Sequence, residues 1–362
     1  MSKIKVLIVD DSRIFRSALE KSLEGIDHVE IIGSVFNGTK ALEFIRRKRP
    51  DIVTLDVEMP GMDGLSVLNA IRKINSTTPD TPPVGVIMIS SFTEHGADVT
   101  IKALEAGAFD FITKPEAKNS EAGIEIIRNQ LLPKLRQYTG KKAKPSSMKI
   151  CSVPITPQRS TQTDSPSSIQ AILIGSSTGG PRALGEILPA LCEKIDIPIL
   201  VVQHMPPKFT DSLARSLDKK CLYTVVEGKH GKIINPKFVY IAPGGSHMLV
   251  RRFDKETGLI MNQQPPENGC RPSINIFFRS AAAVYGRNVI GIVLTGMGAD
   301  GKIGVKSLKR AGAHIIVQDE SSSVVWGMPR SAIDSGCVDE IVPLSNIADT
   351  IISYMNRDKG CG

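Results

Sequence analysis

The chain has 362 residues, of which 41% are hydrophobic and only 5% aromatic, and its formal net charge is +8. This length predicts two domains of ordinary size, and aliphatic rather than aromatic cores are typical of α/β proteins. No apolar run approaches the roughly 20 residues of a membrane-spanning helix, and the N-terminal run Ile4–Val9 is too short for a signal peptide. We therefore expect a cytoplasmic protein without membrane insertion.

Neither the positive charge nor the cysteines indicate a protein that binds nucleic acid or zinc. The basic excess lies partly in residues 139–168 and is otherwise dispersed, without a basic stripe interleaved with aromatic residues. The six cysteines are scattered and never stand at C-x-x-C spacing, so we expect most of them to be buried, reduced thiols. We expect no nucleic-acid partner and a monomer, although the sequence itself does not fix the oligomeric state.

The first part of the chain alternates five apolar strand-like runs with amphipathic helical patterns, such as those over residues 14–23 and 39–48. The expected strands are Ile4–Val9, Val29–Gly33, Ile52–Leu55, Val84–Ile89 and Phe109–Ile112. Repeated β-α units predict a parallel sheet that helices cover on both faces. We assign residues 1–138 to one flavodoxin-like α/β domain with the strand order 2-1-3-4-5.

The composition changes after this domain. Residues 139–168 are rich in Lys, Pro, Ser, Thr and Gln, which predicts a flexible linker. Four prolines in this segment argue against the alternative of a short helix.

A second alternation of apolar runs and helical patterns follows the linker. Its expected strands are Ala171–Gly175, Ile197–Val202, Phe238–Ala242, Val289–Leu294 and His314–Val317. The helical patterns between them cover residues 181–192, 273–284 and 301–311. We expect a doubly wound, mainly parallel α/β domain over residues 169–355, followed by a short tail at residues 356–362.

Three acidic residues follow two strands that are neighbours in the first sheet. Asp10 and Asp11 come directly after the first strand, and Asp56 comes directly after the third. The carboxyl ends of these strands share one crevice, at the point where the strand order reverses. Because three carboxylates in one crevice repel one another, the cluster predicts a site for a hard divalent cation such as Mg²⁺.

Two further strand ends supply a hydroxyl and an ammonium group. Ser90 follows the fourth strand and Lys114 follows the fifth. With Mg²⁺ they would stabilise the oxygens of a phosphoryl group on Asp56, which would be the nucleophile. The alternative is that each acid caps a helix or stabilises a turn, and for Asp11 alone, beside Ser12, this alternative is equally good.

These residues lie in motifs that closely resemble the receiver domain of response regulators, over residues 3–125. The motifs are Val9-Asp10-Asp11-Ser12, Leu55-Asp56-Val57-Glu58-Met59-Pro60-Gly61-Met62-Asp63-Gly64 and Thr113-Lys114-Pro115. The resemblance implies that a histidine kinase supplies phosphate to Asp56. It implies that the Mg²⁺ ligands are Asp10, Asp11, Asp56 and the backbone carbonyl of Glu58. It also implies a receiver switch formed by Ser90, Phe111 and Lys114, with Phe111 as the aromatic residue paired with Ser90.

A serine stands at the end of the first strand of the second domain. The spacing Gly175-x-Ser177-x-Gly179 allows a sharp turn that exposes the Ser177 hydroxyl, and Pro181 suits the first turn of the following helix. This spacing favours a nucleophile elbow. A glycine loop that binds an anion and a plain turn remain alternatives, although no complete phosphate-loop motif is present.

Other strand ends supply a candidate base and a candidate orienting acid for Ser177. His204 follows the second strand of this domain, at the same sheet edge as Ser177, and His247 is the second choice. Asp300 follows the strand over Val289–Leu294 in a glycine-rich loop and is favoured over Asp319. The backbone N–H groups of that loop could donate to an oxyanion. Asp300 could also, or instead, cap the helix expected after it.

The chain order Ser…His…Asp differs from the Ser…Asp…His order of α/β-hydrolases. Six segments resemble instead the CheB family of chemotaxis protein-glutamate methylesterases, over residues 169–355. The segments are Gly175–Pro181, Gln203–Pro206, Ile241–Gly244, Arg271–Ser273, Thr295–Gly301 and Trp326–Pro329. The resemblance implies a triad of Ser177, His204 and Asp300. It also implies that Met297 contributes to the oxyanion hole and that ester hydrolysis needs no cofactor.

Together the two resemblances imply a phosphorylation-activated hydrolase of chemotaxis-type adaptation. It would hydrolyse glutamate methyl esters on chemoreceptors, with release of methanol, and deamidate specific receptor glutamines. Because the linker keeps the receiver near the esterase, we expect the unphosphorylated receiver to restrain the esterase. The alternatives are a receiver fused to a non-catalytic anion-binding module and a transcription factor, although no helix-turn-helix pattern follows residue 139.

Overall fold

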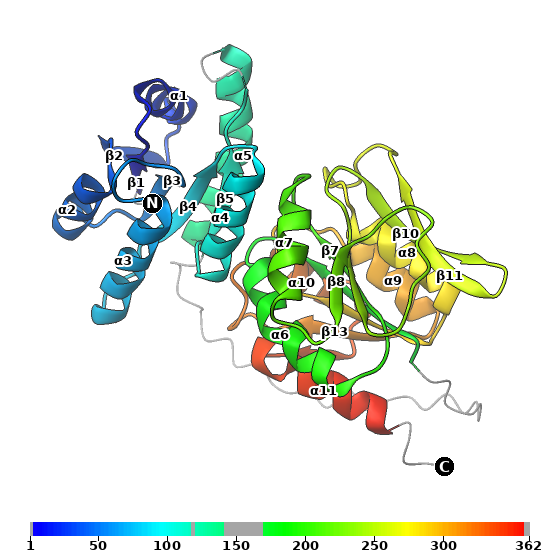
Figure 1. Cartoon of the computed structure of the whole chain (residues 1–362). Coiled ribbons are helices and arrows are strands. Elements are labelled where there is room, and N and C mark those ends of the chain that lie inside the picture. Colours follow the sequence, from blue (N-terminus) through cyan, green and yellow to red (C-terminus); the bar gives the residue numbers. More distant parts are fainter. Residues whose placement is uncertain (1–2, 117–119, 141–168, 358–362) are drawn as a thin grey trace.

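The structure is a computed structural model that describes residues 3–116, 120–140 and 169–357. Figure 1 shows two α/β units, one from the N-terminal part of the chain and one from the C-terminal part. The predicted linker lies outside the described residues except for its first two positions, and so does most of the predicted tail.

The N-terminal unit has the predicted five-stranded sheet. Its strands are β1 (Ile4–Val9), β2 (Val29–Val35), β3 (Ile52–Asp56), β4 (Gly85–Ser90) and β5 (Asp110–Thr113). All neighbours pair in parallel in the order β2-β1-β3-β4-β5. The carboxyl ends of β1 and β3 are therefore adjacent, as the sequence predicts.

Five helices cover this sheet, and alternate residues of β1 face the two sides. Val6 and Ile8 pack with α1 (Arg13–Leu23) and α5 (Glu121–Gly140). Leu7 and Val9 belong to the core on the other side, with α2 (Gly38–Lys48), α3 (Gly64–Thr77) and α4 (Glu94–Glu105). Such burial on both faces explains why the strands are almost continuously apolar.

The C-terminal unit is built on a seven-stranded sheet in which all pairs are parallel, in the order β14-β13-β12-β6-β7-β9-β8. The strands are β6 (Ala171–Ser176), β7 (Ile199–Gln203), β8 (Thr224–Glu227), β9 (Phe238–Ile241), β12 (Val289–Val293), β13 (His314–Gln318) and β14 (Glu340–Val342). A separate antiparallel hairpin joins β10 (His247–Phe253) to β11 (Glu256–Asn262). The predicted doubly wound, mainly parallel fold is confirmed.

Helices lie on both faces of this second sheet as well. One core contains α6 (Gly180–Lys194), α7 (Phe209–Asp218) and α11 (Leu344–Arg357). The other contains α8 (Ile274–Tyr285), α9 (Lys302–Arg310) and α10 (Gly327–Ile333), together with the β10–β11 hairpin. None of the helices in the described part of the chain combines the length and apolarity needed to cross a bilayer.

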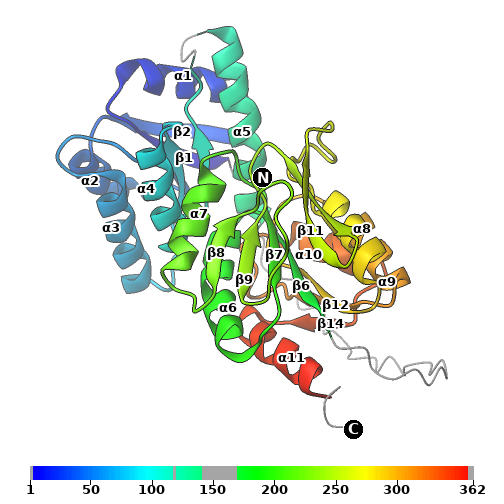
Figure 2. The ribbon, with the colours of Figure 1, turned by 45° about the vertical axis from the view of Figure 1, so that its right-hand side comes forward.

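The two units pack against each other, and α4 of the first contacts α6 and α7 of the second. Figures 1 and 2 show α4 and α7 side by side in both views. This packing brings the start of β5 close to the turn that follows β6, where the Thr178 hydroxyl donates to Asp110 Oδ2 at 2.5 Å. The predicted phosphorylation site and the predicted nucleophile therefore belong to units that touch.

Candidate functional site

The candidate nucleophile lies on a tight turn between β6 and α6. Ser177 directly follows the last residue of β6, and its backbone carbonyl accepts a hydrogen bond from Gly180 N at 2.8 Å. Gly179 has φ +81°, a conformation that glycine adopts without strain. A Cβ atom at Gly180 would lie 1.9 Å from the Gln203 side-chain oxygen, so this position has no room for a side chain. The glycines thus permit the turn that presents Ser177 at the sheet edge.

The favoured histidine and acid lie at the ends of the two strands that flank β6. His204 directly follows β7, and its backbone N donates to Ser176 O at 3.0 Å. Asp300 lies in the loop between β12 and α9. The His204 Nε2 atom is 2.9 Å from Asp300 Oδ2, and the two side chains are 12% and 2% exposed. The predicted pairing of these residues is therefore present in a buried setting.

Asp300 also caps α8, a helix that the sequence did not connect with it. Its carboxylate accepts hydrogen bonds from the Ser273 hydroxyl at 3.0 Å and from the backbone N of Ile274 and Asn275 at 2.7 and 3.1 Å, at the start of α8. Burial alone would raise the pKa of Asp300, but the hydrogen bonds from His204 and from this backbone lower it below its ordinary value. Asp300 is thus a fixed anion beside His204.

A side chain from α8 reaches further into the start of α9. The Asn275 side-chain oxygen accepts hydrogen bonds from Gly301 N at 3.0 Å and from Gly304 N at 2.8 Å. Gly301 N also donates to Asp300 Oδ1 at 3.0 Å, so Asp300 contributes to the start of α9, as the sequence allows, and shares that role with Asn275. The two helices therefore cap each other, and the Asp300 loop is held from both sides.

The second choices for base and acid have other roles. Both ring nitrogens of the buried His247 are occupied, by Pro265 O at 3.2 Å and by Ser273 N at 3.1 Å. Asp319 accepts hydrogen bonds from the side chains of Ser321 and Ser322 within its own turn. These contacts are structural, and they leave His204 and Asp300 as the pair at the sheet edge that carries Ser177.

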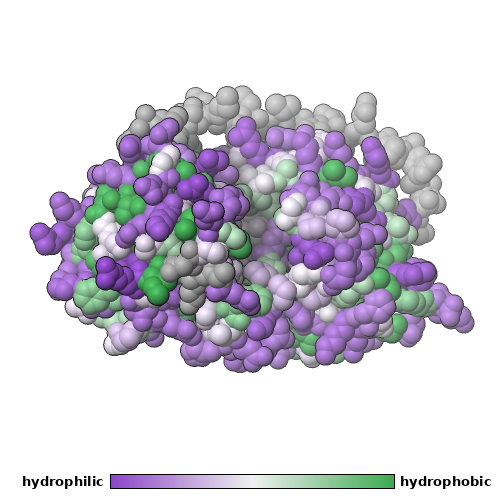
Figure 3. All heavy atoms as spheres, turned by 90° about the horizontal axis from the view of Figure 1, so that it is seen from above, coloured by the Kyte–Doolittle hydropathy of each residue, from purple (hydrophilic) through white to green (hydrophobic). Residues whose placement is uncertain are grey.

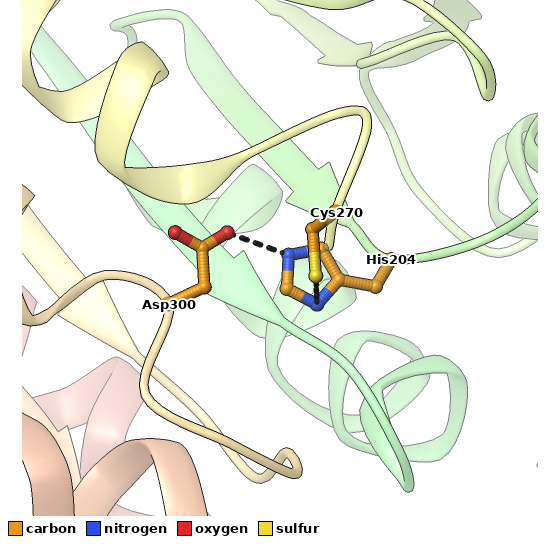
Figure 4. A group of neighbouring side chains, drawn as sticks. All are labelled: His204, Cys270 and Asp300. Carbon is orange, nitrogen blue, oxygen red and sulfur yellow. Dashed lines mark hydrogen bonds and ion pairs between the residues drawn. The ribbon is translucent and has the colours of Figure 1, made fainter. Parts of the chain in front are cut away.

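A cysteine that the sequence did not single out contacts the other nitrogen of His204. Cys270 Sγ lies 3.6 Å from His204 Nδ1, opposite the nitrogen that contacts Asp300 (Figure 4). Burial alone would lower the pKa of His204, but the hydrogen bonds to Asp300 and Cys270 raise it to about 9. No sequence signal marks this contact, because the two residues are 66 positions apart.

Ser177 and His204 line a cavity of about 260 Å³ between the two units. Met297 lines it too, beside residues from the receiver side such as Phe111 and Gln130. Figure 3 shows a hollow between the two units in a largely hydrophilic surface. The candidate nucleophile therefore faces the N-terminal unit.

The acid cluster predicted at the end of the first sheet is also assembled. Carboxylate oxygens of Asp10, Asp11 and Asp56 lie within 4.8 Å of one another. Lys114 Nζ is 2.8 Å from Asp10 Oδ2 and 2.7 Å from Asp56 Oδ2. Burial and the neighbouring Asp10 raise the pKa of Asp56 to about 7, although Lys114 acts in the opposite direction. The side chain that caps α1 is that of Ser12, so the alternative of Asp11 as the N-cap was wrong.

The remaining receiver residues surround this cluster. Glu58 N donates to Asp56 Oδ1 at 3.3 Å. Ser90 is buried at the end of β4, and its hydroxyl donates to Ser91 O at 3.2 Å. Phe111 points away from the cluster toward the second unit, where its ring stacks on that of Phe209 with centroids 4.6 Å apart.

This donor set suits a hard divalent cation. All three side chains offer carboxylate oxygens, and Asp10 Oδ2 is buried without a hydrogen bond, its contact being the ion pair with Lys114. A cation would relieve the repulsion that raises the pKa of Asp56. Asp11, which is exposed, leaves the cluster open to solvent on one side.

Comparisons with known proteins identify both units. The family model described as CheB methylesterase matches residues 172–351, and the response regulator receiver domain matches residues 6–122. A protein-glutamate methylesterase/protein-glutamine glutaminase of Trichodesmium erythraeum is 42% identical over 356 residues, which cover 97% of this chain and 99% of that protein. A relative of the same description from Desulfotalea psychrophila is 40% identical, with 97% and 98% covered.

Among solved structures, the Thermotoga maritima CheB methylesterase catalytic domain is 39% identical, covers 52% of this chain and all of that chain, and has a TM-score of 0.50. The fold and the two sites thus define a response regulator whose receiver is joined to an α/β esterase domain. The chain belongs to the CheB family, the protein-glutamate methylesterases/protein-glutamine glutaminases.

Proposed function

We propose that this chain is a phosphorylation-activated cytoplasmic hydrolase that demethylates glutamate methyl esters on chemoreceptors. Methanol is the product, and specific receptor glutamines are deamidated at the same site. The observation that carries the proposal is the buried His204–Asp300 pair, 2.9 Å apart, at the ends of the strands that flank the Ser177 turn. The family to which the chain belongs supports the choice of substrate.

In this proposal Ser177 Oγ attacks the ester carbonyl, while His204 accepts its proton and later passes it to methanol. Asp300 holds Nε2 of His204, so Nδ1 is the nitrogen that serves the serine. Asp300 also stabilises the imidazolium form of His204. The backbone N–H of Met297 donates to the oxyanion. Water then repeats the sequence on the acyl-enzyme, and with a glutamine substrate ammonia leaves in place of methanol.

The receiver takes a phosphoryl group on Asp56 from a histidine kinase. Asp10, Asp11, Asp56 and the carbonyl of Glu58 hold Mg²⁺, which supplies positive charge to the phosphoryl oxygens when bound. Lys114 supplies a second cation and Ser90 a hydroxyl. Their contacts and burial in the present structure support these roles.

The contact between the two units supports restraint by the unphosphorylated receiver. The hydroxyl of Thr178, next to Ser177, donates to Asp110 Oδ2 at 2.5 Å, and Lys134 binds the same oxygen at 2.7 Å. Phe111 stacks on Phe209 at the start of α7. Phosphorylation that repositions Ser90 and Phe111 would weaken this contact and admit the receptor to Ser177. We take residues 1–138 as the receiver, 139–168 as the tether and 169–355 as the esterase.

The test is methanol release from membranes that carry methylated receptors. Three samples are compared: the intact protein, the intact protein with acetyl phosphate and Mg²⁺, and a fragment that starts at Ser168. We expect the intact unphosphorylated protein to be slowest. If the fragment is no faster, the receiver does not restrain the esterase, and phosphorylation would have to act by stimulation instead.

The same assay tests the nucleophile. We expect Ser177→Ala to abolish methanol release with an unchanged thermal unfolding midpoint, and Asp300→Ala to do less damage than His204→Ala. Ser176→Ala is the matched control, because Ser176 is buried and donates to Gln203 rather than facing the cavity. Activity of Ser177→Ala within about tenfold of wild type would remove Ser177 from this role.

A further inference from the structure

The proposed mechanism has no role for Cys270, which the fold holds beside His204. Cys270 lies in the turn that leads into α8, where the backbone N and O of Cys270 and Glu267 bond each other at 2.9 and 3.2 Å. Its side chain is only partly buried. The thiol is thus fixed in position and still accessible from outside.

His204 lies between a carboxylate and this thiol. Its Nε2 atom contacts Asp300 Oδ2 at 2.9 Å, and its Nδ1 atom contacts Cys270 Sγ at 3.6 Å (Figure 4). A thiol next to an imidazole whose other nitrogen is held by an acid is the arrangement that activates cysteine nucleophiles. Nδ1 is also the nitrogen that serves Ser177 in the proposed mechanism, so the thiol and the serine compete for one base.

The three side chains are also ligand types for a metal ion, and their ligand atoms lie within 4.8 Å of one another. The geometry does not favour that use. Asp300 and Cys270 contact opposite nitrogens of the ring, so one ion cannot take all three in this arrangement. The Asp300 oxygens are moreover engaged by the start of α8. The arrangement therefore favours a reactive thiol over a metal site.

We propose that Cys270 is a thiol that exchanges with small disulfides, and that its capture as a mixed disulfide switches the esterase off. The thiol proton passes to Nδ1 of His204 when its imidazole is neutral, and the thiolate then attacks one sulfur of the small disulfide. The S–S bond of that disulfide breaks, a new S–S bond forms at Cys270, and the other half leaves as a thiolate. The attached group then lies beside His204 and excludes the substrate, and excess thiol reverses the exchange. The second half of this inference rests on the proposed function.

The other described cysteines lack this setting. Cys192 is buried and Cys221 is partly exposed, and the hydrogen bond between them raises the pKa of Cys192 and lowers that of Cys221, but their partner is a thiol and not an imidazole. Cys337 is partly exposed like Cys270, and the Sγ of each contacts a backbone carbonyl at 3.6 Å, that of Ser335 and that of Asn268. Only Cys270 also contacts an imidazole. Cys337 is therefore the matched control for a thiol of similar exposure without a base.

The experiment treats the intact protein with the aromatic disulfide of Ellman's reagent and locates the label by peptide mass mapping over time. We expect Cys270 to react at least about tenfold faster than Cys337, and His204→Gln to reduce that difference to about twofold or less. These rates need no ester substrate. Equal rates at the two cysteines, or a fast rate that survives His204→Gln, would overturn the reactive thiol.

The second readout is methanol release, with each variant scaled to its own untreated rate. We expect wild-type and Cys337→Ser proteins to lose activity in step with the labelling of Cys270 and to recover it in dithiothreitol. After the same treatment, Cys270→Ser should keep most of its untreated activity. Cys270→Ala replaces it in this comparison if the serine variant folds poorly. Inactivation of Cys270→Ser as fast as wild type would overturn the switch. Fast labelling of Cys270 that depends on His204, in a protein that never releases methanol, would contradict the proposed function. It would still support the reactive thiol.

Discussion

His204 sets the pH range in which the esterase can work. Its pKa of about 9 means that at pH 7 only about one hundredth of the protein holds the neutral imidazole that a base requires. A raised histidine pKa removes the base as pH falls, so we expect kcat/KM to rise about tenfold per unit up to about pH 9 and then to level off. The measurement is methanol release by the receiver-free fragment across this range. A plateau that already begins at pH 7 would contradict the prediction.

Asp56 should be the only acceptor of phosphate in the acid cluster. We expect acetyl phosphate to label the intact protein in the presence of Mg²⁺ and not after its removal by EDTA, and Asp56→Asn to abolish labelling. The amide has the same shape but is a poor nucleophile. Asp51→Asn is the control, because Asp51 lies at the opposite end of β3 and accepts from Lys5 N at 2.8 Å. Stoichiometric label on Asp56→Asn would direct attention to Asp10 and Asp11.

At the scale of elements, side chains from each region cap the other helix: Asp300, before α9, caps α8, and Asn275 of α8 caps α9. Asn275→Ala would leave the N–H of Gly304 buried without its side-chain acceptor, and the N–H of Gly301 with the Asp300 carboxylate alone. We expect it to lower the free energy of unfolding of the esterase fragment by about 1–3 kcal/mol and to reduce activity through the Asp300 loop. Urea unfolding checks the first effect. Asn346→Ala, at an exposed position of α11, should change it little, and equal effects of both variants would contradict the cap.

The sequence predicts the central elements well because their burial leaves a strong pattern. The predicted strand Ile4–Val9 matches β1, and nine other predicted strands agree within two residues. The edge strands β8 and β14 were missed, since they are three or four residues long and partly exposed. The β10–β11 hairpin was missed too, because its strands lie outside the β-α alternation.

Contacts between distant residues limit the sequence prediction of the site. Strand ends are sufficient to select His204 and Asp300, because parallel strands bring their carboxyl ends to one edge. The capping of α8 by Asp300, the exchange of caps with Asn275 and the contact of Cys270 with His204 all depend on tertiary packing. No local pattern in the chain encodes these contacts.

At the scale of the whole molecule, opposite charges pair α4 with α7 and with the residues directly after α7. Glu105 binds Lys220 at 2.7 Å and accepts from the Ser216 hydroxyl at 2.8 Å, and Asp98 binds Arg215 at 2.8 Å. These pairs lie at the interface that is proposed to restrain the esterase. Charge reversal at these pairs should weaken the interface without changing the phosphorylation site or the esterase site.

We expect Glu105→Lys to raise methanol release by the intact, unphosphorylated protein by about fivefold or more, because it places two cations opposite each other. Adding Lys220→Glu should restore the slow rate, since the pair is then reversed but complementary. Glu43→Lys, an equal charge change at an exposed position of α2, is the control. A slow rate in Glu105→Lys would mean that these ion pairs do not hold the restrained state.

The stacking of Phe111 on Phe209 has a consequence for the receiver itself. Phe111 belongs to the proposed receiver switch and also packs against the esterase unit, so phosphorylation and docking of the esterase affect each other. The coupling free energy between the two events is the same in both directions. The free energy by which the esterase binds the unphosphorylated receiver opposes phosphorylation of Asp56. A chemoreceptor that binds the esterase and separates it from the receiver would thereby favour phosphorylation of the receiver. The substrate itself would then promote activation of the enzyme that acts on it.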